Sequence, residues 1–355
     1  MKKKFLALAM ILMLTVVMAV VFTSCGGDDS NGGGVETEGD VTVWKLAHSE
    51  STDTMYDRYA HKFADLVEEK SDGRIQVDIY PVGSLGDTAS QVEMLMNGSI
   101  QLGIFASSDV GDLFPAVQAL SLNFVFSDDN AVNAQILTEG KATAALDEMF
   151  AERNLVTYDW FTLGNMQWGS ATVPIRTVDD FDGFKMRIMS SPLLSANYEA
   201  FGATPTPLAF TETYSGLQLG TVDGTEQPMN AMEEMKFYEV LDYITMSNHA
   251  QMASFMSMNG DFYNSLSDED KAMLEEIKEE LRPFGLETLE TLLQEKTDII
   301  LETKPELEII ELTDEERQAF IDASMPVRDQ IEEFAGEEGR EIFNLLLEDV
   351  ETYSN

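Results

Sequence analysis

Beyond the first forty residues, the hydrophobic positions of the chain follow two alternating periods. Apolar residues at every second position predict strands at 41–46, 75–79 and 100–105. Apolar residues spaced three and four apart predict one helix that begins near Asp53 and another that begins at Asp87. Strands that alternate with helices over short connections are typical of a parallel sheet covered by helices on both faces. The pattern therefore predicts an α/β fold.

Two further strand-like passages, at 157–164 and 247–258, enclose a second segment of strands and helices. The chain after position 40 has roughly 315 residues, which is more than a single hydrophobic core usually holds. We therefore expect two lobes, with two chain crossings that form a hinge between them. The predicted boundaries are 41–163 with 253–293 for lobe I, and 164–252 with 294–355 for lobe II.

The chain becomes helical and strongly acidic after residue 266. The segments 267–270 and 313–316 each carry a Ser or Thr followed three residues later by an acidic residue, a pattern that caps the start of a helix. Pro283 lies in the first of these helices, and we expect it to end or kink that helix.

The N-terminal region has the pattern of a processed export signal. Three lysines at positions 2 to 4 precede an apolar run from Phe5 to Phe22, which ends in small residues. We therefore expect residues 1–24 to be a signal peptide that takes no part in the fold. The run is also near the lower length limit of a membrane span, so an uncleaved anchor is the alternative.

Cys25 is the only cysteine in the chain, and it lies directly after Ser24 and before a pair of glycines. This setting resembles a bacterial lipoprotein box, which implies cleavage before Cys25 and a lipid on its sulfur. Residues 25–40 contain almost nothing apolar, so we expect the lipidated Cys25 to be followed by a flexible tether. Acylation of Cys25 would leave no thiol for a disulfide, for catalysis or for a metal site.

The charge balance restricts the possible partners. The chain has 22 basic and 64 acidic residues, which gives a formal net charge of −42. Nucleic acid is therefore a very poor partner, because its phosphates would be repelled. An anionic ligand would need a local positive group inside a cleft that is screened from this surface.

The side-chain combinations of common enzymes are absent from the sequence. The three histidines, His48, His61 and His249, lie far apart and show no metal-ligand spacing. The sequence contains no phosphate-binding loop, dinucleotide fingerprint or nucleophile motif. We therefore predict no cofactor, no metal and no catalytic residue. Acidic pairs are so common in this chain that residue type alone does not exclude a glycosidase.

Several short blocks occur in an order and at spacings that resemble one protein family. They are Pro81–Gly86, Leu122–Phe126, Asp179–Ile188, Phe201–Leu208, Leu217–Gly224, and Lys236–Val240 with Ser247–His249 behind it. The ordered set, over residues 41–280, resembles the solute-binding subunit of tripartite ATP-independent periplasmic (TRAP) transporters, the DctP type. This resemblance implies an α/β, periplasmic-binding-protein-like fold with two lobes. Each lobe would be a mainly parallel sheet flanked by helices, and a hinge and a long connecting helix would join them.

The resemblance also implies where a ligand binds. At the position of Arg187 the family holds an arginine that binds the ligand carboxylate, and a planar guanidinium can do so through two parallel hydrogen bonds. Gln227 stands where the family often has an asparagine that contacts the same carboxylate. Val173 stands where it often has a second arginine, so a second cation for a dianion is missing here. Other residues expected at the cleft are Trp160, Asn165, Trp168, Ser107 and Ser108, and the stretch 48–51 that begins with His48. Core packing is the alternative for both tryptophans, and a structural role is the alternative for His48.

As a member of this family, the chain is expected to capture a small organic acid and to deliver it unchanged to a transporter. Its partners would be the small and large integral membrane subunits of a TRAP transporter. Its location would be the outer face of the cytoplasmic membrane, with an anchor at Cys25. Two other functions stay open, a ligand-presenting subunit of a signalling receptor and a surface-anchored hydrolase.

Overall fold

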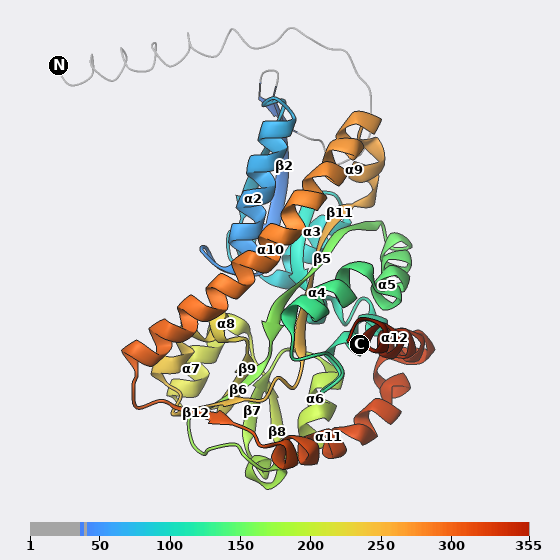
Figure 1. Ribbon diagram of the computed structural model, residues 1–355. Coiled ribbons are helices and arrows are strands. Elements are labelled where there is room, and N and C mark those ends of the chain that lie inside the picture. The colour runs from blue at the N-terminus through green and yellow to red at the C-terminus, as the bar shows by residue number, and fades with distance from the viewer. Residues whose placement is uncertain (1–35, 39–40, 355) are drawn as a thin grey trace, which may run out of the picture. The chain divides into compact units, whose positions relative to one another are not determined.

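The computed structural model describes residues 36–38 and 41–354, and in this part of the chain two six-stranded sheets form the centres of two lobes (Figure 1). The strand order is β1-β2-β4-β11-β5 in lobe I, where β3 also pairs with β2, and β12-β10-β6-β9-β7-β8 in lobe II. The strands of lobe I are β1 (Glu36–Glu38), β2 (Val41–His48), β3 (Ile75–Tyr80), β4 (Leu102–Ala106), β5 (Leu155–Asn165) and β11 (Gln251–Asn259). Those of lobe II are β6 (Gln167–Ser170), β7 (Lys185–Ile188), β8 (Thr204–Pro207), β9 (Gly224–Gln227), β10 (Tyr243–Met246) and β12 (Glu308–Glu311).

The sheet of lobe I has a hydrophobic core on each face. Ile104 and Phe105 are consecutive in β4, so they point to opposite faces, and they belong to two different core clusters. Helices α2 and α10 cover one face, whereas α4, α5 and α12 cover the other. The helices around lobe I are α2 (Met55–Lys70), α3 (Thr88–Met96), η1 (Ser107–Val110), η2 (Pro115–Ser121), α4 (Asn130–Glu139), α5 (Lys141–Ala151), α9 (Gly260–Ser265), α10 (Asp268–Thr303) and α12 (Ile331–Tyr353).

The sheet of lobe II is covered in the same way. Trp168, Met186 and Phe320 belong to the core cluster on the side of α6 and α11, and Leu217 and Met232 belong to the cluster on the side of α7 and α8. The helices around lobe II are η3 (Val178–Phe181), α6 (Pro192–Glu199), η4 (Phe210–Glu212), α7 (Thr213–Gln218), α8 (Met229–Glu234), η5 (Phe237–Glu239) and α11 (Asp314–Asp329).

The predicted strand-helix alternation of lobe I is confirmed. Strands β3, β2 and β4 lie side by side and parallel, with α2 and α3 as the connections between them. Asp87 caps α3 as predicted, and its carboxylate accepts a hydrogen bond from the Ser90 amide at 2.9 Å. The cap of α2 is Thr54 rather than Asp53, because Asp53 has a left-handed φ of 64°.

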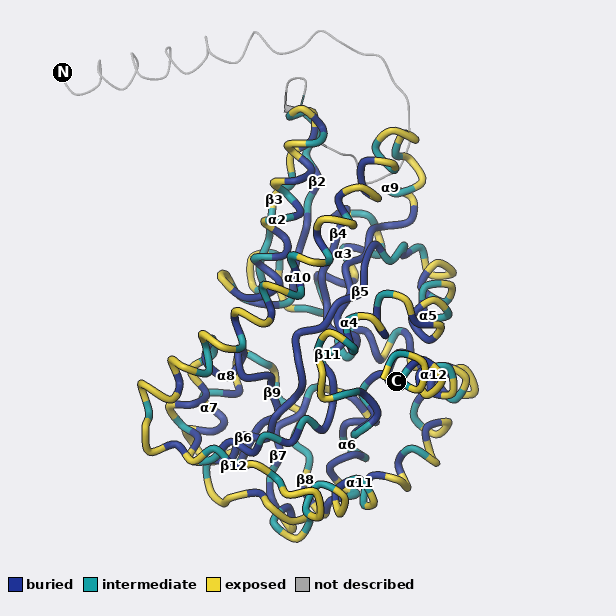
Figure 2. The backbone as a smooth tube through the Cα atoms, in the orientation of Figure 1, coloured by how far each residue is buried: buried dark blue, intermediate teal, exposed yellow. Residues whose placement is uncertain are grey.

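The two-lobed α/β fold class is confirmed, and each sheet combines parallel with antiparallel pairs. In lobe I, β11 is antiparallel to both β4 and β5, and in lobe II, β6 is antiparallel to both β10 and β9. The antiparallel pairs arise because the chain leaves lobe I along β5 and returns along β11. Both crossing strands are almost entirely buried between the helices (Figure 2).

Helix α10 is the long connecting helix that was expected. It packs against α2 in lobe I and against α8 in lobe II (Figure 1). Its start is capped by Ser267, whose hydroxyl accepts from the Asp270 amide at 3.0 Å. The helix does not end at Pro283, since its 36 residues run from Asp268 through Pro283 to Thr303. The carbonyl that loses its donor belongs to residue 279, which is exposed.

Two segments depart from the predicted boundaries. Residues 36–38, expected in the tether, form β1 and pair antiparallel with β2, since backbone pairing does not need apolar side chains. Helix α12, expected in lobe II, packs against η2 and α5 of lobe I. Its apolar residues Ile342 and Leu346 are completely buried in the lobe I core, which explains why the chain returns there.

The predicted signal peptide, residues 1–24, and the predicted lipidation site Cys25 lie outside the described residues. Within residues 36–38 and 41–354, no helix combines the length and the apolar character that crossing a membrane requires.

Candidate ligand-binding site

Arg187 is a buried cation that forms no ion pair with another described residue. It lies in β7, where it pairs in register with Thr225 of β9, and it is 1 % exposed. Its Nε donates to the Leu208 carbonyl at 2.9 Å, but its Nη1 has no partner among the described residues. Burial lowers the pKa of Arg187 to about 10, although the charges of Glu226 and Asp109 oppose this shift. A guanidinium that is held in this way is prepared to bind an anion.

A cavity of about 510 Å³ opens between the lobes beside Arg187. Arg187 and Phe210 line it from lobe II, and Ser108 and Asp109 line it from lobe I. The carbon of the guanidinium lies 5.9 Å from the centre of the Phe210 ring. A volume of this size suits a small ligand. A much smaller cavity of about 20 Å³ adjoins Ser107 and Ser108 and has room for about one water molecule.

Several buried polar atoms of β9 and of α8, the helix that follows it, also have no partner among the described residues. Thr225 is the register partner of Arg187, and Gln227 is two positions further along β9, so the three side chains share one face of the sheet. The Oγ1 of Thr225, the Oε1 of Gln227 and both amide atoms of Asn230 have no partner in the described part of the chain. Buried polar atoms are seldom left unpaired in a protein. We call this set, together with Arg187, the chamber.

The lobe I side of the boundary carries carboxylates. Asp109 lines the cavity, and its Oδ2 accepts hydrogen bonds from the Ser49 hydroxyl and the Ala106 amide, both at 3.0 Å. Burial raises the pKa of Asp109, and these two hydrogen bonds and the charge of Arg187 oppose the rise. The Ser108 hydroxyl donates to the Met189 sulfur at 3.1 Å, which is a direct contact between the lobes.

The opposite face of the lobe II sheet holds a different polar group. The Oε2 of Glu226 accepts hydrogen bonds from the Tyr198 hydroxyl at 2.5 Å and from Nε2 of His249 at 2.8 Å. The Nδ1 of His249 accepts from the Ser247 hydroxyl at 2.8 Å, so an Nε2-protonated ring satisfies both contacts. Trp168 is stacked on His249 with a centroid distance of 4.8 Å. His249 and Trp168 are therefore part of the core packing of lobe II.

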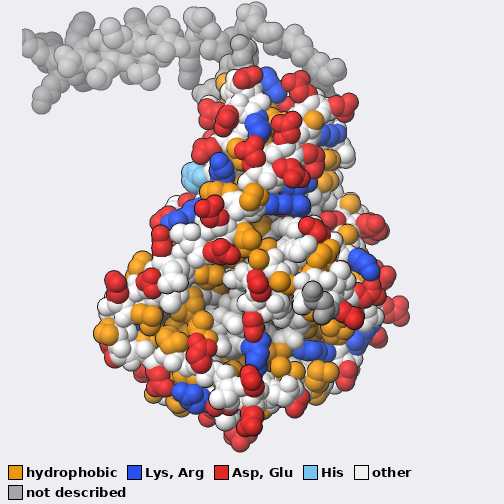
Figure 3. All heavy atoms as spheres, viewed as in Figure 1, with side chains coloured by type: hydrophobic (Ala, Val, Ile, Leu, Met, Phe, Trp, Pro, Cys, Tyr) orange, Lys and Arg blue, Asp and Glu red, His pale blue; other side chains and the backbone are white. Residues whose placement is uncertain are grey.

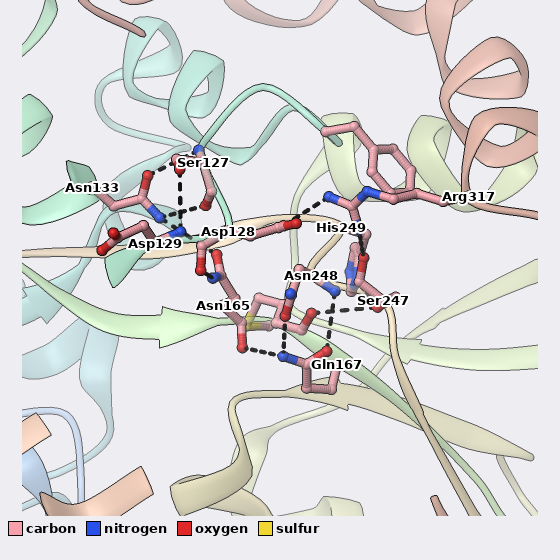
Figure 4. Close-up of polar contacts among 12 residues, drawn as sticks. Ser127, Asp128, Asp129, Asn133, Asn165, Gln167, Ser247, Asn248, His249 and Arg317 are labelled. Carbon is pink, nitrogen blue, oxygen red and sulfur yellow. Dashed lines mark hydrogen bonds and ion pairs between the residues drawn. The ribbon is translucent and has the colours of Figure 1, made fainter. Parts of the chain in front are cut away.

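The hinge is a network of fully paired polar side chains, drawn in Figure 4. The Nδ2 of Asn165 donates to the Asp128 carbonyl at 2.9 Å, and its Oδ1 accepts from Asn133 at 3.5 Å. Both amide atoms of Gln167 are bonded as well, to the Asn165 carbonyl and to the side chain and backbone of Asn248. The network fixes the point at which the chain passes from one sheet to the other.

Arg317 of α11 adds an interlobe contact to this network (Figure 4). Its Nη2 donates to Oδ1 of Asp128 at 2.8 Å, and its Nη1 donates to the Ser247 carbonyl. The loop of lobe I that contains Asp128 is thereby tied to the second crossing.

The structure brings together some of the predicted site residues and not others. Arg187 and Gln227 lie on one face of the lobe II sheet, and Ser107 and Ser108 line the cavities at the lobe boundary. The other four have partners elsewhere: His48 contacts Asp57 at 3.3 Å, Trp160 donates to Asp147 at 2.8 Å, Asn165 belongs to the hinge, and Trp168 belongs to the core.

His48 and Trp160 have environments that differ from a ligand site. Burial lowers the pKa of His48 to about 4, and the neighbouring carboxylate of Asp57 only partly opposes the shift. Trp160 faces a separate cavity of about 420 Å³ between α4 and α10, together with Arg282 and Pro283. Ligand contacts of His48, Trp160, Asn165 and Trp168 therefore remain predictions. The positions of these residues in the structure do not add support for them.

Sequence reasoning missed three polar residues at the lobe boundary, namely Asp109, Asn230 and Glu234. Glu50 lies in the stretch 48–51 that was expected at the cleft, but it was not singled out there. Glu50 and Asn230 are at most 5 % exposed. For Asn230 the only available signal was its position at the start of a helix that follows the Gln227 strand. Among the described residues, no group of three or more His, Cys, Asp and Glu side chains is arranged to hold a metal ion.

Comparison with known proteins agrees with this architecture. Residues 46–334 match the family described as bacterial extracellular solute-binding protein, family 7 (DctP). The ectoine-binding periplasmic protein TeaA of Halomonas elongata is 32 % identical over 318 residues, which cover 89 % of this chain and 92 % of TeaA. The C4-dicarboxylate-binding protein DctB of Bacillus subtilis is 31 % identical over 309 residues, which cover 87 % of each chain.

Solved structures show the same similarity. The structure of the ectoine-binding protein of the TeaABC TRAP transporter superposes with a TM-score of 0.83 at 31 % identity, and covers 87 % of this chain and 99 % of that protein. A TRAP solute-binding protein from Shewanella oneidensis with bound succinate has a TM-score of 0.80 at 26 % identity, with 88 % and 100 % coverage.

These matches define the class of protein, an extracytoplasmic solute-binding protein with two lobes. The chain belongs to family 7 of the bacterial extracellular solute-binding proteins, and it is of the type that serves TRAP transporters. The family resemblance seen in the sequence is therefore confirmed. Proteins of this type bind small ligands and work with membrane subunits.

Proposed function

We propose that this protein captures a small organic acid between its two lobes and that Arg187 binds the carboxylate of that acid. The observation that carries the proposal is the unpaired Nη1 of a guanidinium that is 1 % exposed and makes no ion pair in the described part of the chain. Among its relatives are proteins named for ectoine and for C4-dicarboxylates, all of which bear carboxylates. A carboxylate would pair with the guanidinium through charge-assisted hydrogen bonds.

Because the protein surface is acidic, an anionic ligand depends on a cation inside the cleft. Acidic side chains are spread over the face shown in Figure 3, in keeping with the net charge of −42. An anionic ligand gains nothing from this surface at long range, so its binding free energy must come from contacts inside the cleft. Arg187 is 1 % exposed, so its guanidinium is shielded from most of the acidic surface.

Binding would couple to closure of the lobes. Arg187 and Gln227 belong to lobe II, and Ser107, Ser108 and Asp109 belong to lobe I. A ligand that contacts both sets has more partners when the lobes are closed, and it therefore shifts the equilibrium toward the closed form. The closed form would then deliver the unchanged acid to the small and large membrane subunits of a TRAP transporter.

The function is tested by identification of the natural ligand. Protein purified under native conditions is unfolded, the released small molecules are measured by mass spectrometry, and the identified acid is titrated back by calorimetry. We expect one organic acid at about one equivalent, bound again with micromolar or better affinity and recovered unchanged after long incubation. Release of a chemically altered product would favour the hydrolase, and failure of any carboxylic acid to bind would contradict the proposal.

The lipid anchor is a separate part of the proposal. Cleavage before Cys25 and acylation of its sulfur would hold the protein at the outer face of the cytoplasmic membrane, since two or three acyl chains anchor firmly where one exchanges. Membrane fractionation of the full chain and of Cys25→Ser tests this. The wild-type protein should sediment with membranes and carry the added lipid mass, whereas the variant should not. Equal sedimentation of the two would point instead to an uncleaved N-terminal anchor.

A further inference from the structure

A second set of buried polar atoms lies near the chamber and has the opposite charge. Glu50 follows β2 in lobe I and is 5 % exposed, and its Oε2 has no hydrogen-bond partner among the described residues. Glu234 ends α8 in lobe II, and its Oε1 is also buried without a partner. Glu50 lies within electrostatic range of Glu234, so the two buried carboxyls come from opposite lobes to one region of the lobe boundary. We call these two residues the acidic pair.

Asp109 and α8 connect the acidic pair to the chamber. Asp109 is within electrostatic range of both Arg187 and Glu50. Glu234 is four residues after Asn230 in α8, so both side chains lie on one face of that helix. Neither Glu50 nor Glu234 is among the charges that act on Arg187, so the acidic pair is more distant from the guanidinium than Asp109 is.

The cations near the acidic pair are bound to other acids. Lys296 of α10 contacts Glu233 at 2.9 Å, and Arg58 of α2 contacts Asp53 at 3.0 Å. Both influence Glu234 only as more distant charges, and Glu233 counteracts them. On the lobe I side the other groups that face Glu50 are Asp109, which is also acidic, and Tyr56.

Burial raises the pKa of both members of the pair. For Glu50, hydrogen bonds from the Thr54 side chain and the Tyr56 backbone oppose the rise, and Asp109 adds to it. For Glu234, the charge of Glu50 adds to the effect of burial. Two buried carboxylates that each keep an unpaired oxygen and have no ion-pair partner among the described residues are unfavourable, so closure of the lobes requires either a proton or a cation between them.

We propose that the acid held by Arg187 also carries a cationic group, an ammonium or an amidinium, and that this group lies between Glu50 and Glu234 when the lobes close. The inference rests on the proposed function, because Arg187 supplies the other end of the site. N–H donors of such a group would satisfy the unpaired oxygens from both lobes at once. A ligand of this kind is neutral overall, so the acidic surface does not repel it.

The test compares acids that differ in the second group. Calorimetry measures the binding of succinate, of 4-aminobutanoate, which has an ammonium in place of one carboxylate on a chain of four carbons, and of ectoine, a cyclic amidine carboxylic acid. The ligand released from purified protein is examined for a basic nitrogen in parallel. We expect the tightest binder to be zwitterionic, with an affinity at least about tenfold above that of succinate. A tightest binder without a cationic group would overturn the inference and leave the proposed function intact. If no acid bound at all, the proposed function itself would be contradicted.

Two variants test the position of the cationic group. Glu50→Gln and Glu234→Gln should each lower the affinity for the zwitterion at least about tenfold. Each should raise the affinity for succinate, because a repulsive charge is removed. A merely structural role would weaken both ligands alike. The exposed Glu69→Gln in lobe I and Glu199→Gln in lobe II are the matched controls, and they should change neither affinity. Wild-type affinity for the zwitterion in both Glu50→Gln and Glu234→Gln would place the cation elsewhere.

Discussion

The hinge and the chamber are both buried and polar, but their side chains are satisfied in opposite ways. In the hinge, both amide atoms of Asn165 and of Gln167 have partners within the protein. In the chamber, both amide atoms of Asn230 have none, and one polar atom each of Arg187 and Gln227 is also unpaired. The comparison indicates that the hinge groups stabilise the fold, whereas the polar atoms of the chamber are available to bind a ligand.

Removal of the chamber cation should give the largest effect on binding. Arg187→Ala deletes a buried, charge-assisted contact, which should cost on the order of 2 to 5 kcal/mol, or roughly 30-fold to several thousand-fold in affinity. Arg187→Lys should lose nearly as much ligand affinity, because an ammonium cannot reproduce the two parallel hydrogen bonds. Titration calorimetry with the identified ligand measures the loss.

Arg176 provides the control for this prediction. It is an arginine of the same lobe that is exposed and paired with Glu308 at 3.3 Å, so Arg176→Ala should bind the ligand normally. Ligand-free Arg187→Ala should melt no lower than the wild type, since a buried unpaired charge has been removed. Near-normal affinity in both Arg187 variants would show that the carboxylate is held by another group.

Two asparagines offer a matched test of the difference between hinge and chamber. Asn165→Ala should lower the free energy of unfolding by about 1 to 3 kcal/mol, because Asp128 and Asn133 lose their partner. Asn230→Ala should leave the stability of the ligand-free protein unchanged or higher, but it should weaken ligand binding. Chemical denaturation and calorimetry on both variants separate the two outcomes. Equal destabilisation by the two substitutions would remove the distinction.

The acidic pair predicts a pH dependence that depends on the ligand. Burial raises the pKa to about 7 for Glu50 and to about 8 for Glu234, so closure that keeps the two carboxyls buried around a ligand without a cation takes up a proton. The affinity for succinate should therefore be highest below these values and should fall, by up to about tenfold per pH unit for each proton, as the pH rises through them.

A zwitterion should not show this dependence, because its own cation replaces the proton. Calorimetry in buffers of different ionisation enthalpy measures the protons taken up directly. An equal uptake of protons with both kinds of ligand would argue against a cation between Glu50 and Glu234.

Two threonines give the smallest expected effect. Thr225→Val replaces an unpaired hydroxyl with a methyl group, so the ligand-free protein should be as stable as the wild type and binding should weaken by about 1 kcal/mol. Thr162→Val should instead destabilise the protein by a similar amount, because the Thr162 hydroxyl accepts from the Gly164 amide at 2.8 Å. Loss of stability in Thr225→Val would indicate that its hydroxyl has a structural partner, such as a bound water.

The fold could be predicted from sequence wherever a periodic pattern was strong. The alternation of apolar residues in β2, β3 and β4 and the cap at Asp87 were sufficient to predict the first parallel strands and helices of lobe I. The packing of α12 on lobe I could not be predicted, because an amphipathic helix shows which face is buried but not the surface that covers it. The short strand β1 was missed because its residues carry no apolar pattern.

The candidate site could be predicted only in part. Arg187 could be found because basic residues are rare in this chain and the family resemblance covers its strand. Glu50 was covered only as part of the stretch 48–51, and Glu234 could not be found. Both are among 64 acidic residues, and no local pattern separates a buried carboxylate from an exposed one. Trp160 and Trp168 were expected at the cleft, but aromatic residues serve cores and ligand sites alike.

The position of β11 has a consequence for the order in which the protein can fold. This strand lies between β4 and β5, although it is more than eighty residues later in the chain than either of them. Neither strand can complete its hydrogen bonding until residues 251–259 have been synthesised, and loop closure over such a distance is slow. The amino-terminal half alone would keep open strand edges and exposed apolar surface. Lobe I can therefore fold as a unit only after most of the chain has been made.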